Sequence, residues 1–400
     1  MARVVITGQG TVNALGMDVA GTLSAMMQGS SAIAPLDIPD VDRLMIRIGA
    51  QVQGYDPLAH FPKNKLPLYD RFTQFALIAG AEAMAQSGLT ISDELAPRAG
   101  VVLGTAGGGL QTQDDNFRAV YEQGKNRVHP FVVPRLMHNA AASHLSMTYG
   151  LQGPVFSLST ACASSNHAMG QAFQMIRSGG ATVVLTGGAE AMLSFGGIKA
   201  WEGLRVMSKD GCRPFCASRN GMVQGEGAAV FVFEEYTHAR ARGAEILAEV
   251  AGFSMNSDAA DIVVPSRQGA ERAMRAALAD AGLSAVDIGY INAHGTGTRA
   301  NDKTEAAAIV DVFGETPPPV SATKSMHGHL IGATGAVELL ACIAALRDGI
   351  IAPTAGFQTP DPDCGLDVVP NVARRAEVGA TLSNAFAFGG LNAVLALRKI

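Results

Sequence analysis

Cys162 is the residue of this sequence best placed to act as a nucleophile. It stands in Leu158-Ser-Thr-Ala-Cys-Ala-Ser-Ser-Asn166, among small residues that would let a carbonyl group approach the backbone closely. An expected strand precedes it and an expected helix follows. The unpaired N–H groups of a helix N-terminus lower the pKa of a thiol from its usual value of about 8.5. Because most free cysteines are simply buried, a structural cysteine remains the alternative at this point.

Two histidines also lie just beyond expected strands. His294 stands where the apolar run Ile288–Asn292 enters a Gly/Thr turn, and His329 lies in a second strand end and glycine-containing turn that starts at Ser321. Turns supported by rigid strands commonly carry reactive side chains. The alternative for either histidine is a hydrogen-bonded core residue.

A lysine and a glutamate accompany His329. Lys324 stands in the same turn, and Glu338 follows on the next expected helix. A buried Lys–Glu pair beside a histidine would hold the ring and bias its protonation. An ordinary ion pair remains the alternative, and His327 is interpreted as incidental.

The segment Ser383-Asn-Ala-Phe-Ala-Phe-Gly-Gly-Leu-Asn392 places two phenylalanines against a Gly-Gly turn. Gly389 and Gly390 would turn a backbone N–H toward an oxyanion, and Phe388 would wall an acyl channel. A simple core turn is the alternative.

The elements that must position these residues alternate along the chain as strand, turn and helix, which predicts an α/β fold. The segments from Ser159 and from Ser321 share one order: strand end, small-residue turn, helix, glycine stop and apolar run. We therefore expect two similar halves with one shared core, residues 1–251 and 252–400. Expected strands are Arg3–Thr7, Gly100–Leu103, Thr182–Thr186, Ala229–Phe233, Ile288–Asn292, Pro319–Ala322 and Val394–Leu397; expected helices span about 72–86, 163–177, 270–281, 302–312 and 335–347.

Composition excludes several classes of protein. The net charge is -5 without a basic run, which argues against nucleic acid binding. No apolar run reaches the roughly 18 residues that span a bilayer, so no membrane insertion is expected. The start of the chain lacks the pattern of a signal peptide, and five scattered cysteines do not suggest a disulfide framework, so a cytoplasmic location is expected.

Three other kinds of site are not expected in this sequence. The N-terminal Gly8-Gln-Gly-Thr-Val-Asn13 has an asparagine where a dinucleotide fingerprint needs its third glycine. Cys212 and Cys216 have no second pair nearby, so a zinc site is not expected. No Gly-x-Ser-x-Gly elbow occurs, which removes the basis for a serine hydrolase.

Together these segments resemble the 3-oxoacyl-(acyl carrier protein) synthases of the elongating, two-histidine kind. The resemblance runs through the whole chain and is carried by VVITGQGTVNALG, STACASS, GGAEAM, GMVQGEGAA, NAHGTGT, TKSMHGHLIGATGAVE and NAFAFGGLN. It implies a thiolase-like fold, with two similar α/β halves in a five-layered αβαβα core. It also implies that acyl and malonyl groups arrive as thioesters on the phosphopantetheine of an acyl carrier protein, with no metal or further cofactor.

Residue by residue, the resemblance makes Cys162 the nucleophile that accepts the acyl group. His294 and His329 would flank the malonyl thioester as CO2 leaves, with Lys324 and Glu338 in support. The backbone N–H groups of Cys162 and Phe388 would form the oxyanion hole. Substrate contacts are expected from Gly107, Thr296, Thr298, Phe386, Phe388 and Gly389, with the two threonines on the phosphopantetheine arm.

Some positions depart from the commonest pattern of that family. Cys216 stands where an aspartate is usual, Ala387 and Leu391 replace a glycine and a threonine, and Leu68-Tyr69 replaces a basic surface. These changes suit a specialised synthase, for example a nodulation-type enzyme. Candidate docking charges are Lys63, Lys65, Arg71 and Arg205.

At Gly107 many relatives carry a bulky residue, so we expect a deeper acyl pocket there. The resemblance also implies a homodimer, with the strand around Thr182–Thr186 as one contact.

Two related functions compete with condensation. A thiolase needs a second cysteine, and NAFAFGGLN offers none. A non-catalytic chain-length partner lacks the nucleophile, and Cys162 is present.

Overall fold

The computed structural model describes all 400 residues, and ten strands form one mixed sheet. Their order is β10-β9-β13-β14-β8-β1-β7-β6-β4-β5. β4 runs parallel to β5 and β6, and β9 runs parallel to β10 and β13, whereas all other neighbours are antiparallel. The bounds are β1 (Val4–Asn13), β4 (Ala99–Gly104), β5 (Val155–Leu158), β6 (Val183–Glu190), β7 (Gly227–Glu235), β8 (Ala248–Ser257), β9 (Ile288–Asn292), β10 (Val320–Ser321), β13 (Ala380–Ala387) and β14 (Leu391–Arg398).

The ten strands divide into two sets of five with the same connectivity. In each set the first strand in chain order lies at the middle of the full sheet, followed outward by the fifth, fourth, second and third. β1 and β8 join the sets through pairs that include Val4 with Val250 and Ile6 with Ala248. The predicted pair of similar α/β halves is therefore confirmed. The boundary at 251/252 stays a prediction, and it falls inside β8.

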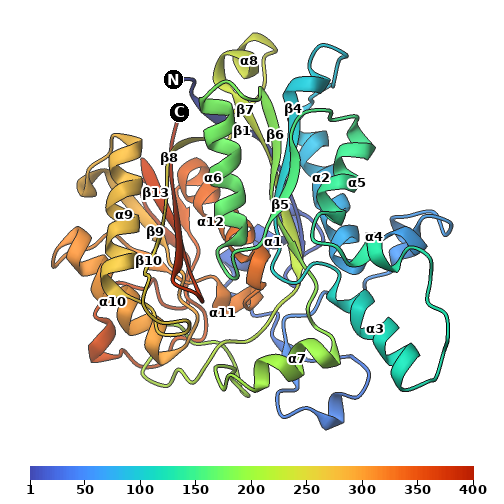
Figure 1. Cartoon of the computed structure of the whole chain (residues 1–400). Helices are drawn as coiled ribbons and strands as arrows, with labels where there is room; N and C mark the ends of the chain where they lie inside the picture. The colour runs from blue at the N-terminus through green and yellow to red at the C-terminus, as the bar shows by residue number, and fades with distance from the viewer.

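Helices fill three layers around these strands, as Figure 1 shows from one side to the other. α2 (Arg71–Ser87) and α5 (Ala140–Tyr149) cover the outer face of the first set, and α9 (Arg267–Ala281) and α10 (Arg299–Phe313) cover the second. α6 (Ser164–Arg177) and α12 (Thr334–Asp348) lie between the two sets. Three separate apolar clusters fill the spaces between the layers. The five-layered thiolase-like fold is confirmed.

The two central helices are buried to different extents. In α12, every residue from Thr334 to Leu346 is buried. The two helices approach closely at Gly335, where a Cβ atom would lie 1.8 Å from Oδ1 of Asn166. By contrast, α9 faces solvent on one side and buries the positions of a single helical stripe, including Ala270, Ala273 and Ala277.

The remaining elements lie outside the five layers or link them. α3 and α7 lie toward the end of the molecule away from the chain termini, and α4 lies between α3 and α5 at the side of the first set (Figure 1). Two small sheets pair β2 with β3 and β11 with β12. The bounds of these remaining helices and strands are α1 (Val19–Met27), α3 (Leu110–Tyr121), α4 (Val132–Leu136), α7 (Phe195–Glu202), α8 (Tyr236–Ala241), α11 (Lys324–His327), β2 (Ala34–Pro35), β3 (Ile48–Gly49), β11 (Ile350–Ile351) and β12 (Arg374–Arg375).

The predicted strands and long helices are all present, but the expected contact at Thr182–Thr186 is wrong. β6, which begins at Val183, is buried along its whole length between β4 and β7, so no second chain can pair with it. The free edges of the sheet are β5 and β10. No helix of the structure combines the length and the apolarity that crossing a bilayer requires.

Candidate active site

Cys162 lies in a tight turn between β5 and α6. The preceding residue, Ala161, has a positive φ of 50°, an unusual backbone conformation for a residue with a side chain. The hydroxyl of Ser164 stabilises this turn by donating to the carbonyl of Ala161 at 2.6 Å and accepting from the N–H of Thr160 at 2.9 Å. Cys162 lines a cavity, and only 6% of the residue is exposed.

The thiol of Cys162 is surrounded by two backbone donors and a distant cation. Burial raises its pKa to about 11, although the charge of Lys324 and the N–H groups of Phe388 and Cys162 itself act to lower it. The predicted lowering by the helix N-terminus is therefore wrong for the resting site, because desolvation of the thiolate outweighs it. The two N–H groups at the sulfur are those expected to form an oxyanion hole.

This raised pKa predicts how Cys162 reacts with an alkylating agent. Its alkylation by iodoacetamide should keep rising from pH 7 to about pH 10 without a plateau, because the thiolate fraction grows until the pKa is reached. The rate is measured by intact mass against Cys162→Ala, which reports the other cysteines. A plateau below pH 8 would contradict the raised pKa.

His294 is positioned by its own backbone and by Lys324. Glu305 accepts hydrogen bonds from the N–H groups of His294 and Gly295, both at 2.8 Å. The ammonium of Lys324 lies 3.5 Å from Nδ1 of His294 and donates to its carbonyl and to Glu338 at 2.6 Å. Since an ammonium only donates, Nδ1 is the acceptor, and the proton of the neutral ring is on Nε2.

His329 has the same tautomer for a different reason. Its Nδ1 accepts from the N–H of Ile331 at 3.1 Å and lies 2.8 Å from the hydroxyl of Thr334. The proton of the neutral ring is therefore on Nε2, which is buried and has no partner within the protein. A buried donor of this kind needs an acceptor. The free Nε2–H of His329 is therefore available to a substrate carbonyl oxygen.

The two imidazole rings face the same space. Their centroids are 5.6 Å apart and their planes are inclined at 84°. Burial, then the charge of Lys324, lowers the pKa of both rings well below the ordinary value, so both are neutral near pH 7. Two neutral Nε2–H donors are thus available to a carbonyl oxygen.

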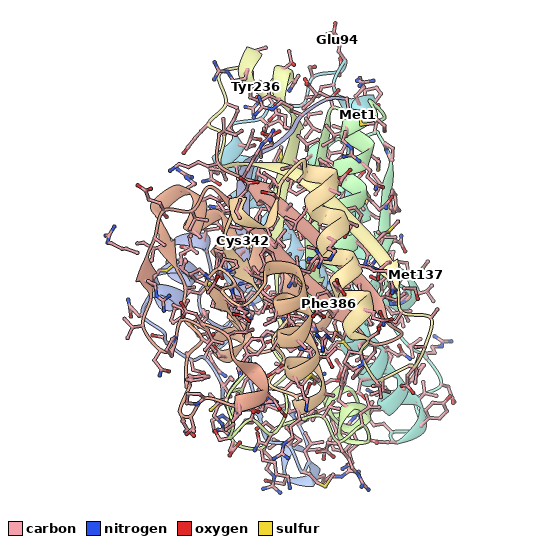
Figure 2. All side chains as sticks on the ribbon, turned by 90° about the vertical axis from the view of Figure 1, so that its left-hand side faces the viewer. Met1, Glu94, Met137, Tyr236, Cys342 and Phe386 are labelled. Atoms are coloured by element: carbon pink, nitrogen blue, oxygen red, sulfur yellow. The ribbon has the colours of Figure 1, made fainter.

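A cavity of about 590 Å³, including its mouth, brings most of the predicted residues together. Phe386, labelled in Figure 2, lies well below Met1 and Tyr236, toward the end of the molecule away from the termini. Lys324 and Glu338 lie behind His294 and do not line the cavity, and the pKa of Glu338 is raised to about 7 by burial. The predicted residues that line it are Cys162, His294, Thr296, Thr298, His329, Phe386 and Phe388.

The sequence did not single out several other lining residues. Trp201, the single tryptophan of the chain, stacks on Phe388 with a centroid distance of 5.9 Å. It lies on α7, outside every motif, and its rarity was the one available signal. Val206, Met222, Val263 and Pro265 also line the cavity and have no sequence signal of their own.

Two predicted glycines do not have the expected geometry. Gly107 lies outside the cavity lining, and a Cβ atom there would meet Met192 at 2.9 Å, so the space of the expected deeper pocket is filled. Gly389 donates its N–H to the carbonyl of Ile262 at 2.8 Å and Gly390 to Ala387 at 3.1 Å. Neither N–H is free for an oxyanion, because each already donates to a backbone carbonyl.

One of the four candidate docking charges differs from its predicted role. Arg71 is paired with Glu226 at 2.7 Å and its side chain is 22% exposed, so it is a structural residue rather than a docking charge. Lys63, Lys65 and Arg205 are exposed and form no ion pair. Cys216 is buried, and its sulfur accepts from the N–H groups of Gln358 and Thr359.

Family models cover both halves of the chain. The N-terminal domain of β-ketoacyl synthases matches residues 1–239, and the C-terminal domain matches residues 247–358. The chain belongs to the β-ketoacyl synthase family. The resemblance found in the sequence is thereby confirmed, and this β-ketoacyl synthase is a condensing acyltransferase of the 3-oxoacyl-(acyl carrier protein) synthase kind.

Two curated relatives cover almost the whole synthase. Nodulation protein E of Rhizobium leguminosarum bv. trifolii is 48% identical over 400 residues, 100% of this chain and 99% of the relative. The 3-oxoacyl-[acyl-carrier-protein] synthase 2 of Staphylococcus aureus (strain N315) is 38% identical over 406 residues, 99% of this chain and 98% of the relative.

Solved structures agree with this assignment. The ishigamide ketosynthase/chain length factor has a TM-score of 0.95 at 36% identity and covers 100% of this chain and 99% of its own. A second structure, described as a type II PKS acyl-carrier protein in complex with its ketosynthase, has a TM-score of 0.90 at 30% identity, with 100% and 99% covered.

Proposed function

We propose that this synthase joins an acyl group held on Cys162 to a malonyl unit on an acyl carrier protein, by decarboxylative Claisen condensation. One observation carries the assignment of roles: the sulfur of Cys162, with two backbone N–H groups beside it, shares a cavity with two neutral Nε2–H donors. The arrangement separates a nucleophile with an oxyanion hole from a pair of donors for a second carbonyl group.

In the first half-reaction, Cys162 takes the acyl group from its carrier. The sulfur attacks the thioester carbonyl, and the negative oxygen of the tetrahedral intermediate is held by the N–H groups of Cys162 and Phe388. The C–S bond to the carrier then breaks, and the carrier thiol leaves with the proton of Cys162. Burial raises the pKa of the free thiol to about 11, so the resting Cys162 carries its proton near neutral pH.

In the second half-reaction, the carbonyl oxygen of the malonyl thioester accepts from Nε2 of His294 and of His329. The bond to the carboxylate breaks, CO2 leaves, and the electron pair forms an enolate whose oxygen the two donors stabilise. The enolate carbon attacks the acyl thioester on Cys162, the C–S bond breaks, and the thiolate takes up a proton. Neutral rings suit this step, since decarboxylation requires hydrogen-bond donors and no base.

Lys324 and Glu338 act as positioning residues. The Lys324 ammonium fixes Nδ1 of His294 as an acceptor, and Glu338 balances its charge in a fully buried position. The loss of CO2 drives the reaction, so no metal or cofactor beyond the carrier's phosphopantetheine takes part. Thr296 and Thr298 hydrogen-bond that arm where it enters, and their hydroxyls lie 2.9 Å apart at the cavity wall.

The pathway is fatty acid synthesis or a related specialised acyl pathway, in the cytoplasm. The similarity to a nodulation protein supports the specialised alternative. All five cysteines are free, which suits a reducing compartment. The experiment that tests the function supplies octanoyl and malonyl thioesters of an acyl carrier protein and measures 3-oxodecanoyl carrier and CO2. Equal amounts of both products are expected, and release of CO2 without condensation would contradict the function.

The active form is a homodimer that associates through the β5 edge. Strand β5 is half-buried and pairs on one side only, and the neighbouring α3–α5 segment exposes large apolar side chains, which together favour association. The exposed residues are Phe117, Tyr121, Phe131, Val133 and Met147.

Light scattering is therefore expected to give twice the 41.4 kDa of one chain at micromolar concentration. Phe131→Glu/Met147→Glu should shift the protein to a single-chain mass, because two charges would be buried in the interface. A wild-type protein of single-chain mass would contradict the homodimer.

A further inference from the structure

Three consecutive apolar side chains are exposed between β8 and α9. Ile262 is 73% exposed, Val263 40% and Val264 60%, and we refer to these three residues as the apolar lip. A run of exposed apolar residues is unfavourable in water and usually marks a contact surface. The carboxylate of Asp261 accepts from the N–H groups of Val263 and Val264 at 2.7 and 2.9 Å, so the run has a defined shape.

The lip forms one side of the mouth of the active-site cavity. Val263 and the adjoining Pro265 line the same cavity as Cys162. Cys162 is 6% exposed and Val263 is 40% exposed, so the cavity runs from the lip inward to the sulfur. Any molecule that delivers a thioester to Cys162 from a larger carrier must therefore pass beside the lip.

The lip is fixed to the catalytic turn. Its Ile262 carbonyl accepts from the N–H of Gly389, and the N–H of Asp258 donates to the carbonyl of Gly390 at 2.9 Å. Gly389 directly follows Phe388, whose N–H lies at the sulfur of Cys162. A partner that rests on the lip is thus held at a set distance from the reacting atoms.

Positive charge flanks the mouth. Arg205 and Arg299 are exposed, form no ion pair, and adjoin the lining residues Val206 and Ala300. The two acids of the lip segment form no ion pair with these arginines: Asp261 accepts the backbone contacts above, and Asp258 accepts from the N–H of Ser266 at 3.0 Å and the amide of Asn392 at 2.7 Å. The rim therefore presents apolar surface beside unneutralised arginines, which complements an acidic partner with an apolar patch.

We propose that the apolar lip, with Arg205 and Arg299, is the surface on which the acyl carrier protein docks. The inference rests on the proposed function, because it is the carrier-bound thioester that has to reach Cys162. In this proposal the main docking contact is the segment between β8 and α9, and not Lys63 and Lys65 as the sequence predicted. Apolar contact supplies most of the affinity, and the arginines orient the acidic carrier.

The test compares two thioesters of one acyl group, octanoyl on an acyl carrier protein of bacterial fatty acid synthesis and octanoyl-N-acetylcysteamine. Ile262→Ser/Val264→Ser removes the lip but leaves Val263 in the cavity wall. Acylation of Cys162 is followed by intact mass. With the carrier substrate, kcat/KM should fall by about 10-fold or more, the usual effect of losing central apolar contacts. With octanoyl-N-acetylcysteamine it should stay unchanged.

The matched control is Val286→Ser/Val372→Ser, since these side chains are 93% and 74% exposed and line no part of the cavity. It should keep wild-type rates with both substrates. An unchanged rate with the carrier, or an equal loss with both substrates, would overturn the docking surface. A wild-type protein that neither thioester acylates would overturn the proposed function, and the docking surface with it.

Discussion

Replacing both His294 and His329 with alanine is expected to lower malonyl decarboxylation by roughly 10³-fold or more, because a single donor to a developing oxyanion is already worth about 10²–10³. Both rings carry their proton on Nε2 and face one space, so the enolate would lose both donors at once. The measurement is release of labelled CO2 from malonyl-loaded acyl carrier protein.

Acylation of Cys162 is the internal control for this double variant. The sulfur and its two N–H neighbours do not depend on the histidines, so octanoyl transfer to Cys162 should persist. Each single variant should show a smaller loss of decarboxylation than the double variant. Decarboxylation at the wild-type rate without both rings would refute their assignment as enolate donors.

Cys162→Ala is expected to abolish condensation and to leave malonyl decarboxylation intact. Without the sulfur no acyl group is held in the cavity, and losing a catalytic nucleophile costs roughly 10⁴–10⁶-fold in turnover. The two Nε2–H donors remain, and alanine leaves room beside them for the malonyl group. Chromatography of 3-oxoacyl product and release of CO2 from the same reaction separate the two steps.

The opposite patterns of these variants make the assignment of roles testable. If Cys162→Ala lost decarboxylation as fully as the histidine variant, the two half-reactions would share one centre. If it kept condensation, another residue would be the nucleophile.

The fold and the reactive side chains were predictable because both depend on local sequence. Short apolar strands and Gly-containing turns place Cys162, His294 and His329 after strands of corresponding position, and the repeated connectivity brings them together. The resemblance to condensing enzymes supplied their roles, since spacing alone left each residue with a structural alternative.

The features that the sequence did not predict depend on contacts between distant segments. Met192 fills the space beside Gly107, and Glu226 neutralises Arg71; neither neighbour is close in the sequence. The pKa of Cys162 is decided by burial, which outweighs the local helix terminus.

The sequence also did not predict which side chains lie at the cavity mouth or which strand lies at a sheet edge. Trp201 lines the cavity because of where α7 is placed in the fold. The sequence of the apolar lip is that of an ordinary loop, and only the structure shows that it is exposed and lies at the mouth of the cavity. The strand that begins at Val183 was expected at an interface because it is apolar, but strand order decides which apolar strand lies at an edge.

Intact-mass measurement after incubation with octanoyl-loaded acyl carrier protein tests the central claim most directly. The wild-type protein should gain one octanoyl group, mapped by digestion to the peptide that contains Cys162. The histidine double variant should gain it as well, and Cys162→Ala should gain none. An octanoyl adduct that persists in Cys162→Ala, or that maps to another residue in the wild-type protein, would contradict the account.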